Sequence, residues 1–191
     1  MHKDFDYKSY KIIYSCCVDV SKSGSFMEHI VGITEAAILA NVDITVWATC
    51  RRHKNESLEL FQLNCHKWIL RFSKKKYLNY LYFDILGAIK LFSLSPSDTI
   101  LYIRPNLFSF VQLGIAKILG FKVILEKNGI SSEELRVKGN WYYRLVQSLE
   151  IIQIQSATRV ICVSKGIAEF YSNTVSTPLK VVPNGCLSLI H

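Results

Sequence analysis

The sequence lacks a long uninterrupted apolar run, and this excludes a conventional membrane-spanning helix. No segment reaches the roughly 18 consecutive apolar residues that such a helix needs, although 50% of the 191 residues are hydrophobic. Residues 1–6 contain acids and no apolar stretch, so we expect no secretory signal there. We therefore expect a single domain with a substantial core. We expect a cytoplasmic protein, or one that binds peripherally to the inner face of the membrane.

Disordered composition and metal-ligand spacing are missing as well. Charged residues make up 20% of the chain and aromatic residues 12%, which is typical of a folded protein. No two of the six cysteines form a Cys-x-x-Cys pair, and no other ligand spacing suggests a metal site. We expect reduced thiols, several of them buried, and neither a metal nor a cofactor of the chain's own. The cysteines are Cys16, Cys17, Cys50, Cys65, Cys162 and Cys186.

Positive charge, in contrast, is abundant and unevenly spread. The net charge is +8, and residues 51–76 hold eight Lys or Arg residues against two acids. Within residues 67–83, aromatic side chains flank a basic run at Lys74, Lys75 and Lys76. Such a segment suits an anionic bilayer surface, and a partly buried helix with a solvated lysine turn is an equally open interpretation. Single-stranded nucleic acid also binds basic and aromatic surfaces, but we expect no nucleic-acid partner.

Predicted strands and helices alternate along the whole chain. Most of the strands are nearly continuous Ile, Val and Leu runs, which is typical of strands covered on both faces. The pattern predicts an α/β fold, a Rossmann-like parallel sheet with helices on both faces. The strands are expected at residues 11–17, 43–48, 58–63, 99–103, 122–126, 159–163 and 179–182. The helices are expected at residues 26–40, 77–94, 107–119, 141–155 and 164–171, with 131–140 as the most loop-like interior segment.

Candidate ligand contacts follow the predicted strands, because ligands of such sheets lie beyond the carboxyl ends of the strands. Gly24 and Ser25 open the first helix, where free N–H groups suit a phosphate; an ordinary turn with a serine cap is the alternative. Arg104 directly follows its strand and can clamp an anion, or form a surface salt bridge. Glu126 follows the fifth strand and can bond a sugar hydroxyl or accept its proton; a strand-end acid before the turn at Asn128 is the alternative.

The last third of the sequence carries a family resemblance. A strand running into Val163-Ser164, then a helix, then a strand running into Pro183-Asn184-Gly185 resembles the interdomain edge of the family-4 glycosyltransferases of the GT-B fold. Ser164, Asn184 and Gly185 are the interdomain-edge residues that this resemblance implies. Considered locally, they are a helix cap and a tight turn.

The first helix is similar to the same family. Gly24-Ser25 followed by His29 resembles the family's Gly-Gly and later His, with serine in place of the second glycine. The resemblance implies an acceptor or phosphate site at this edge of the sheet, and a packing or capping histidine is the alternative for His29. The implied site residues are Gly24, Ser25, His29, Arg104, Glu126 and Asn128; no catalytic residue is assigned.

The resemblance also implies a missing half. In the family, Pro-Asn-Gly leads into the nucleotide-sugar-binding domain, whereas this sequence stops six residues after Gly185. Residues 1–191 would then be the N-terminal, acceptor-side domain, without the C-terminal donor domain. The implied reaction moves a sugar from a nucleotide sugar to a glycan or lipid-linked acceptor, in surface polysaccharide synthesis. A nucleotide-sugar donor is expected to bind only with the missing domain, and a separately encoded donor domain is the expected partner.

Other functions remain in competition with this one. A non-catalytic remnant or a binding module of the same fold shares all of these motifs. A dinucleotide-dependent oxidoreductase needs Gly-x-Gly-x-x-Gly after the first strand and usually an acid after the second. The chain offers Gly24 alone and Arg51-Arg52 in place of the acid. The sequence therefore argues against an oxidoreductase and leaves the transferase half and the binding module open.

Overall fold

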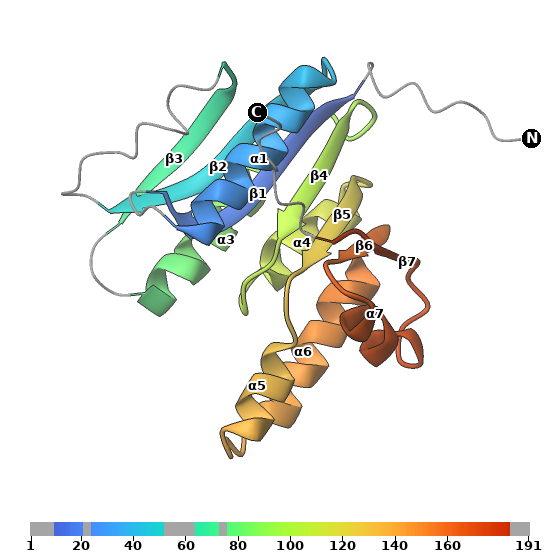
Figure 1. Cartoon of the computed structure of the whole chain (residues 1–191). Helices are drawn as coiled ribbons and strands as arrows, with labels where there is room; N and C mark the ends of the chain where they lie inside the picture. Colours follow the sequence, from blue (N-terminus) through green and yellow to red (C-terminus); the bar gives the residue numbers. More distant parts are fainter. Residues whose placement is uncertain (1–9, 21–23, 52–63, 73–75, 184–191) are drawn as a thin grey trace, which may run out of the picture.

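The computed structural model describes residues 10–20, 24–51, 64–72 and 76–183, which form seven strands and six helices (Figure 1). With the labels of Figure 1, the strands are β1 (Lys11–Asp19), β2 (Asp43–Arg51), β3 (His66–Phe72), β4 (Thr99–Arg104), β5 (Lys122–Lys127), β6 (Arg159–Cys162) and β7 (Leu179–Val181). The helices are α1 (Ser25–Leu39), α3 (Lys76–Leu91), α4 (Phe110–Ile118), α5 (Ser131–Val137), α6 (Tyr143–Ser156) and α7 (Lys165–Ser172).

The strands form one parallel sheet in the order β3-β2-β1-β4-β5-β6-β7. From β1 the chain moves through β2 to β3 in one direction, and from β4 to β7 it moves in the other. The order therefore reverses between β1 and β4, and open α/β sheets bind ligands beyond the carboxyl ends of the strands at such a point. The predicted Rossmann-like α/β fold is confirmed.

Helices cover both faces of the sheet. Successive side chains of a strand point to opposite faces, so strands that are apolar at every position supply two cores at once. The α1 face buries Tyr14, Cys16, Met27, Ile30 and Val46. The opposite face, which α3, α4, α6 and α7 cover, buries Trp47, Phe83, Leu91, Leu101, Leu113, Leu125, Ile154, Val160 and Tyr171.

The structure corrects the prediction for residues 58–72. The predicted strand at 58–63 lies outside the described residues, and the third described strand is β3. In β3 the ring of Trp68 lies 5.0 Å from that of Trp47 and 6.1 Å from that of Phe83. Trp68 is therefore partly buried and packs against the core, where Phe83 is fully buried, so Trp68 does not belong to an exposed basic and aromatic surface.

Residues 131–140 are also more regular than predicted. They begin with α5, which forms a hairpin with α6 that projects away from the sheet (Figure 1). The first turn of α5 is held by Glu150 of α6, which accepts hydrogen bonds from the backbone N–H groups of Ser131 at 3.0 Å and Ser132 at 3.3 Å. Gly139, with φ of 71°, follows the helix end in the left-handed region that favours glycine. The cap comes from a distant residue, so the local composition did not reveal it.

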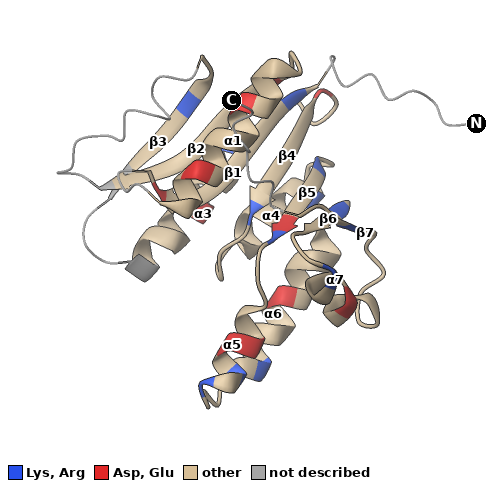
Figure 2. Ribbon diagram, viewed as in Figure 1, with Lys and Arg blue, Asp and Glu red and all other residues tan. Residues whose placement is uncertain are grey.

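In the view of Figure 2, Lys and Arg positions alternate with Asp and Glu positions along the described strands and helices. No disulfide joins the described cysteines, and Cys16, Cys50 and Cys162 are buried. None of the helices in the described part of the chain has the length and hydropathy that a membrane crossing needs.

Candidate functional site

Glu126 is a buried acid near the carboxyl end of β5, with 1% of its surface exposed. The sequence predicts a strand over residues 122–126 that ends at Glu126, but β5 continues by one residue through Lys127, which pairs with Cys162 of β6. The strand was predicted one residue too short because the charged pair Glu126-Lys127 is not typical of a strand interior. Its carboxylate lies on the α1 face of the sheet, where it meets His29.

His29 approaches Glu126 from α1. Its Nε2 lies 2.8 Å from Oε1 of the carboxylate, and its side chain is 20% exposed. A nitrogen that faces a carboxylate at this distance carries the proton, so a neutral imidazole presents its Nδ1 lone pair elsewhere. The carboxylate thus fixes both the tautomer and the orientation of a ring that solvent can reach.

Asn128 and Tyr14 also contact Glu126. Nδ2 of Asn128 donates to Oε1, and the hydroxyl of the fully buried Tyr14 lies 3.5 Å from Oε2. Oδ1 of Asn128 is buried and has no hydrogen-bond partner among the described residues. A buried acceptor without a partner is costly.

Arg104 brings positive charge to the same edge. It ends β4, and its guanidinium lies over the ring of Phe26 with 4.9 Å between the guanidinium carbon and the ring centroid. Burial raises the pKa of Glu126, but hydrogen bonds from His29 and Asn128 and the charge of Arg104 outweigh it, so the pKa lies below its usual value. Glu126 is therefore ionised at neutral pH.

Gly24 and Ser25 open α1 beside this cluster. Gly24 occupies the N-cap position with φ of 136°, a region that favours glycine. No described atom lies within 4 Å of the place where its Cβ would stand, so the space there is open. Ser25 is the first helical residue and is exposed. The predicted serine cap is wrong, because the chain turns at Gly24 one residue earlier.

On the opposite face of β5, the next residue forms a second ion pair. Nζ of Lys127 lies 2.8 Å from Oε1 of Glu150, and both side chains are nearly buried, at 7% and 5% exposure. Glu150 also accepts from the N–H groups of Ser131 and Ser132 and, at 2.6 Å, from the hydroxyl of Ser132. Burial raises the pKa of Glu150, but Lys127 and these hydrogen bonds outweigh it and hold the pKa below its usual value.

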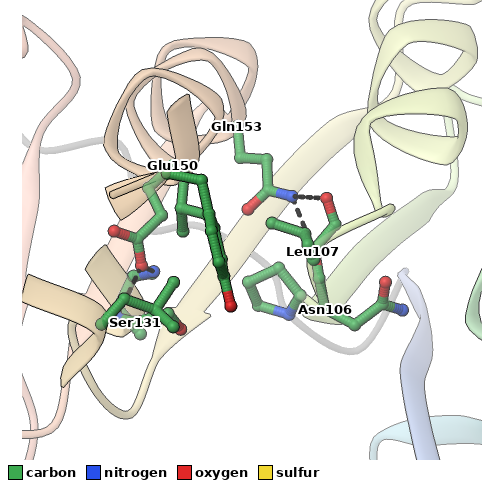
Figure 3. A pocket seen from close by; sticks show the side chains of 10 residues that line it. Asn106, Leu107, Ser131, Glu150 and Gln153 are labelled. Atoms are coloured by element: carbon green, nitrogen blue, oxygen red, sulfur yellow. Dashed lines mark hydrogen bonds and ion pairs between the residues drawn. The ribbon is translucent and has the colours of Figure 1, made fainter. Parts of the chain in front are cut away.

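A pocket of about 330 Å³ opens beside this second pair, between the β4–α4 loop and the α5–α6 hairpin. Figure 3 shows Glu150 and Ser131 on one side of it and Asn106, Leu107 and Gln153 on the other. Nε2 of Gln153 donates to the backbone oxygen of Asn106 at 2.8 Å and ties the loop to α6. The remaining lining residues are Pro105, Lys127, Leu135, Tyr142 and Val146.

Sequence reasoning missed the pocket and its ion pair. A signal for Glu150 was present: it falls on the stripe of α6 that also holds Val146 and Ile154, both buried. A charge on an apolar stripe indicates a buried partner. The partner itself, Lys127, lies 23 residues away and no local pattern identifies it.

The other candidates have mixed outcomes. The hydroxyl of Ser164 accepts from the N–H of Ile167 at 3.3 Å and caps α7, the local role expected of it. Asn184, Gly185, Lys74 and Lys75 lie outside the described residues, and the side chain of Lys76 is not described either. In the described part of the chain, no three His, Cys, Asp or Glu side chains are placed to hold a metal ion.

Comparison with known proteins gives a fold but no family. No protein-family model and no curated protein sequence matches the chain. Among solved structures, it is similar to a sucrose-phosphate synthase from Thermosynechococcus elongatus, with a TM-score of 0.68 and 12% sequence identity over 93% of this chain. It is also similar to the apo form of the lipopolysaccharide outer core galactosyltransferase WaaB, with a TM-score of 0.61 and 14% identity over 92% of this chain.

Both neighbours are glycosyltransferases of the GT-B fold. At these identities the likeness establishes a shared fold. The chain spans about half the length of each, 48% of the first and 46% of the second.

Proposed function

We propose that this chain is the acceptor-side half of a glycosyltransferase, which moves a sugar from a nucleotide sugar to a glycan or lipid-linked acceptor in surface polysaccharide synthesis. The observation that carries the proposal is the His29–Glu126 pair at the carboxyl ends of the strands. It lies where this sheet type binds ligands, and it couples a buried carboxylate to a ring that solvent reaches. The shared fold with two glycosyltransferases supports the assignment.

The chemistry follows from the orientation of His29. Glu126 holds the Nε2 proton, and the Nδ1 lone pair is free to take the proton of an acceptor hydroxyl as its oxygen bonds to the sugar carbon. The ionised Glu126 then stabilises the imidazolium that forms. The bond between that sugar carbon and the nucleotide breaks, and the nucleotide leaves with its electron pair. Arg104 stands nearby to attract a phosphate of the donor or acceptor.

The test compares the chain alone with the chain joined to the nucleotide-sugar-binding half of a GT-B glycosyltransferase. We expect residues 1–191 alone to transfer no sugar and to bind nucleotide sugars weakly in calorimetry, because they provide one wall of the cleft. The joined protein is expected to transfer sugar. Transfer by residues 1–191 alone at about 1 per second or faster would overturn the proposal. A joined protein that binds glycans without transferring sugar would favour a binding module.

We also propose that α3 brings the protein to an anionic membrane. In the sequence it begins at the last residue of the basic run of Lys74, Lys75 and Lys76. Large apolar side chains are exposed along one stripe of the helix at spacings of three and four: Leu78, Tyr82, Ile85 and Ile89. An exposed apolar stripe beside positive charge suits the surface of an anionic bilayer.

Sedimentation with lipid vesicles tests the membrane contact. Binding is expected to need anionic lipid and to weaken with salt. Replacing Lys74, Lys75 and Lys76 by Gln should reduce it, whereas the same change at the exposed Lys138, Lys165 and Lys180 should have less effect. Equal losses in the two triple variants would indicate general charge attraction and contradict a specific surface.

A further inference from the structure

We propose that the pocket between the β4–α4 loop and the α5–α6 hairpin binds one neutral sugar ring of the acceptor, an inference that rests on the function proposed above. Its volume of about 330 Å³ is at the lower end for ligand sites, which suits a small ring rather than a nucleotide. The pocket is separate from the His29–Glu126 cluster, because Lys127 and Glu126 point to opposite faces of β5.

The charges in the pocket favour a neutral ligand. Lys127 and Glu150 are the ionisable residues among the described lining residues, apart from the phenol of Tyr142, and they neutralise each other at 2.8 Å. A phosphate would meet a lysine whose charge is already matched and a carboxylate that repels it. A sugar hydroxyl can accept from the ammonium group of Lys127, which has three donors, and brings no charge that the pocket must balance.

The walls of the pocket match the two chemical sides of a sugar ring. Pro105, Leu107, Leu135 and Val146 supply apolar surface, and Tyr142 adds an aromatic ring. Sugar rings have C–H faces that pack on such surfaces and a rim of hydroxyls that bonds to polar groups. Ligand pockets in general combine mostly apolar walls with a few placed polar groups.

Polar contacts hold the walls in position before any ligand arrives. Gln153 joins α6 to the β4–α4 loop through the carbonyl of Asn106 at 2.8 Å. Glu150 joins α6 to β5 through Lys127 and to α5 through Ser131 and Ser132. A pocket fixed in this way loses little conformational freedom on binding. Its ligand specificity therefore depends on a shape that the fold already provides.

The pocket and the His29–Glu126 pair share one strand end. Glu126 and Lys127 are consecutive residues of β5, so their Cα atoms are about 3.8 Å apart. An acceptor of several sugar rings that crosses the carboxyl edge of the sheet can place one ring in the pocket and present another to His29. The pocket would then fix the acceptor's register and so the hydroxyl that reacts.

Saturation-transfer NMR on the full chain tests this inference directly. The probes are neutral glucose, galactose and N-acetylglucosamine, disaccharides built from them, and inorganic phosphate as the anionic probe. The first variant, Tyr142→Ala, removes the aromatic wall. The second, Leu107→Trp, fills the pocket from a side chain that is 37% exposed and leaves the ion pair intact. The control, Tyr143→Ala, removes a neighbouring ring that does not line the pocket.

We expect millimolar binding of at least one neutral sugar, with an affinity about tenfold lower in Tyr142→Ala, lost in Leu107→Trp and unchanged in Tyr143→Ala. Emission from Trp141, which is 88% exposed with its ring 5.8 Å from that of Tyr142, should report the same binding. Displacement of the sugar by phosphate, binding unaffected by Leu107→Trp, or no binding by any sugar would overturn the inference. The transfer assay on the joined protein tests the proposed function separately, because it does not depend on where the acceptor binds.

Discussion

Two consecutive residues of β5 form ion pairs on opposite faces of the sheet, and the two pairs differ in how completely they are closed. On one face Glu150 accepts four hydrogen bonds, and both it and Lys127 are nearly buried. On the other face Glu126 is equally buried, but its partner His29 is 20% exposed. A fully satisfied buried pair holds elements together, whereas a buried acid with an accessible partner can act on a ligand.

The largest effect on stability is expected from breaking the Lys127–Glu150 pair. Glu150→Ala leaves the charge of Lys127 buried without a partner and removes the cap of α5. The free energy of unfolding should fall by about 3–5 kcal/mol, measured by urea denaturation. Glu133→Ala is the control, since its pair with Arg136 is on the surface and should leave the denaturation midpoint nearly unchanged. Equal effects of the two changes would show that the buried pair is not structural.

Breaking the His29–Glu126 pair should lower the free energy of unfolding by less. Glu126→Ala leaves His29 and Asn128 without their carboxylate, but His29 reaches solvent and can be hydrated. We expect a loss of about 1–3 kcal/mol in the same urea experiment. A loss as large as that of Glu150→Ala would remove the distinction between the two pairs and make Glu126 a structural residue.

Lowering the pH should weaken the stabilisation that both ion pairs provide. Both carboxyls have a folded-state pKa below the usual value. Their stabilisation is therefore present above the unfolded-state pKa of about 4.3 and is lost as the pH falls through the folded-state pKa. Thermal unfolding should show stability declining below about pH 4.3, with a shallower decline in Glu150→Gln, which has no carboxyl to protonate. Stability that rises on acidification would contradict this account.

The sheet could be predicted because each strand is indicated by the residues of its own short segment. Strands such as β1, β4 and β5 are short apolar runs between turns, and their order alternates with helices. β3 was missed because His66, Lys67 and Arg71 interrupt its apolar pattern, while Trp68 and Leu70 still pack on the core. Helix α5 was missed because its first turn is capped by Glu150, a contact between segments 18 and 19 residues apart.

The sequence could predict that the candidate site lies at the carboxyl edge of the sheet. It could not predict which side chains contact each other there. Chain order and the parallel fold place Arg104 and Glu126 near the carboxyl ends of the neighbouring strands β4 and β5, and His29 in the helix that follows β1. The contact between His29 and Glu126 joins residues 97 positions apart. That contact depends on how α1 packs on the sheet, which no spacing in the sequence encodes. The Lys127–Glu150 pair and its pocket depend in the same way on how α6 packs.

The most direct measurement of the central claim is sugar transfer by the joined protein with His29 altered. His29→Gln preserves much of the side-chain volume and a hydrogen bond to Glu126 but cannot take a proton. Transfer should fall by about 10²–10⁴-fold while the stability stays near that of the parent. His66→Gln, a change at an exposed histidine at the start of β3, is the matched control and should keep full activity. Parent-like transfer by His29→Gln would contradict the claim that this pair performs the chemistry.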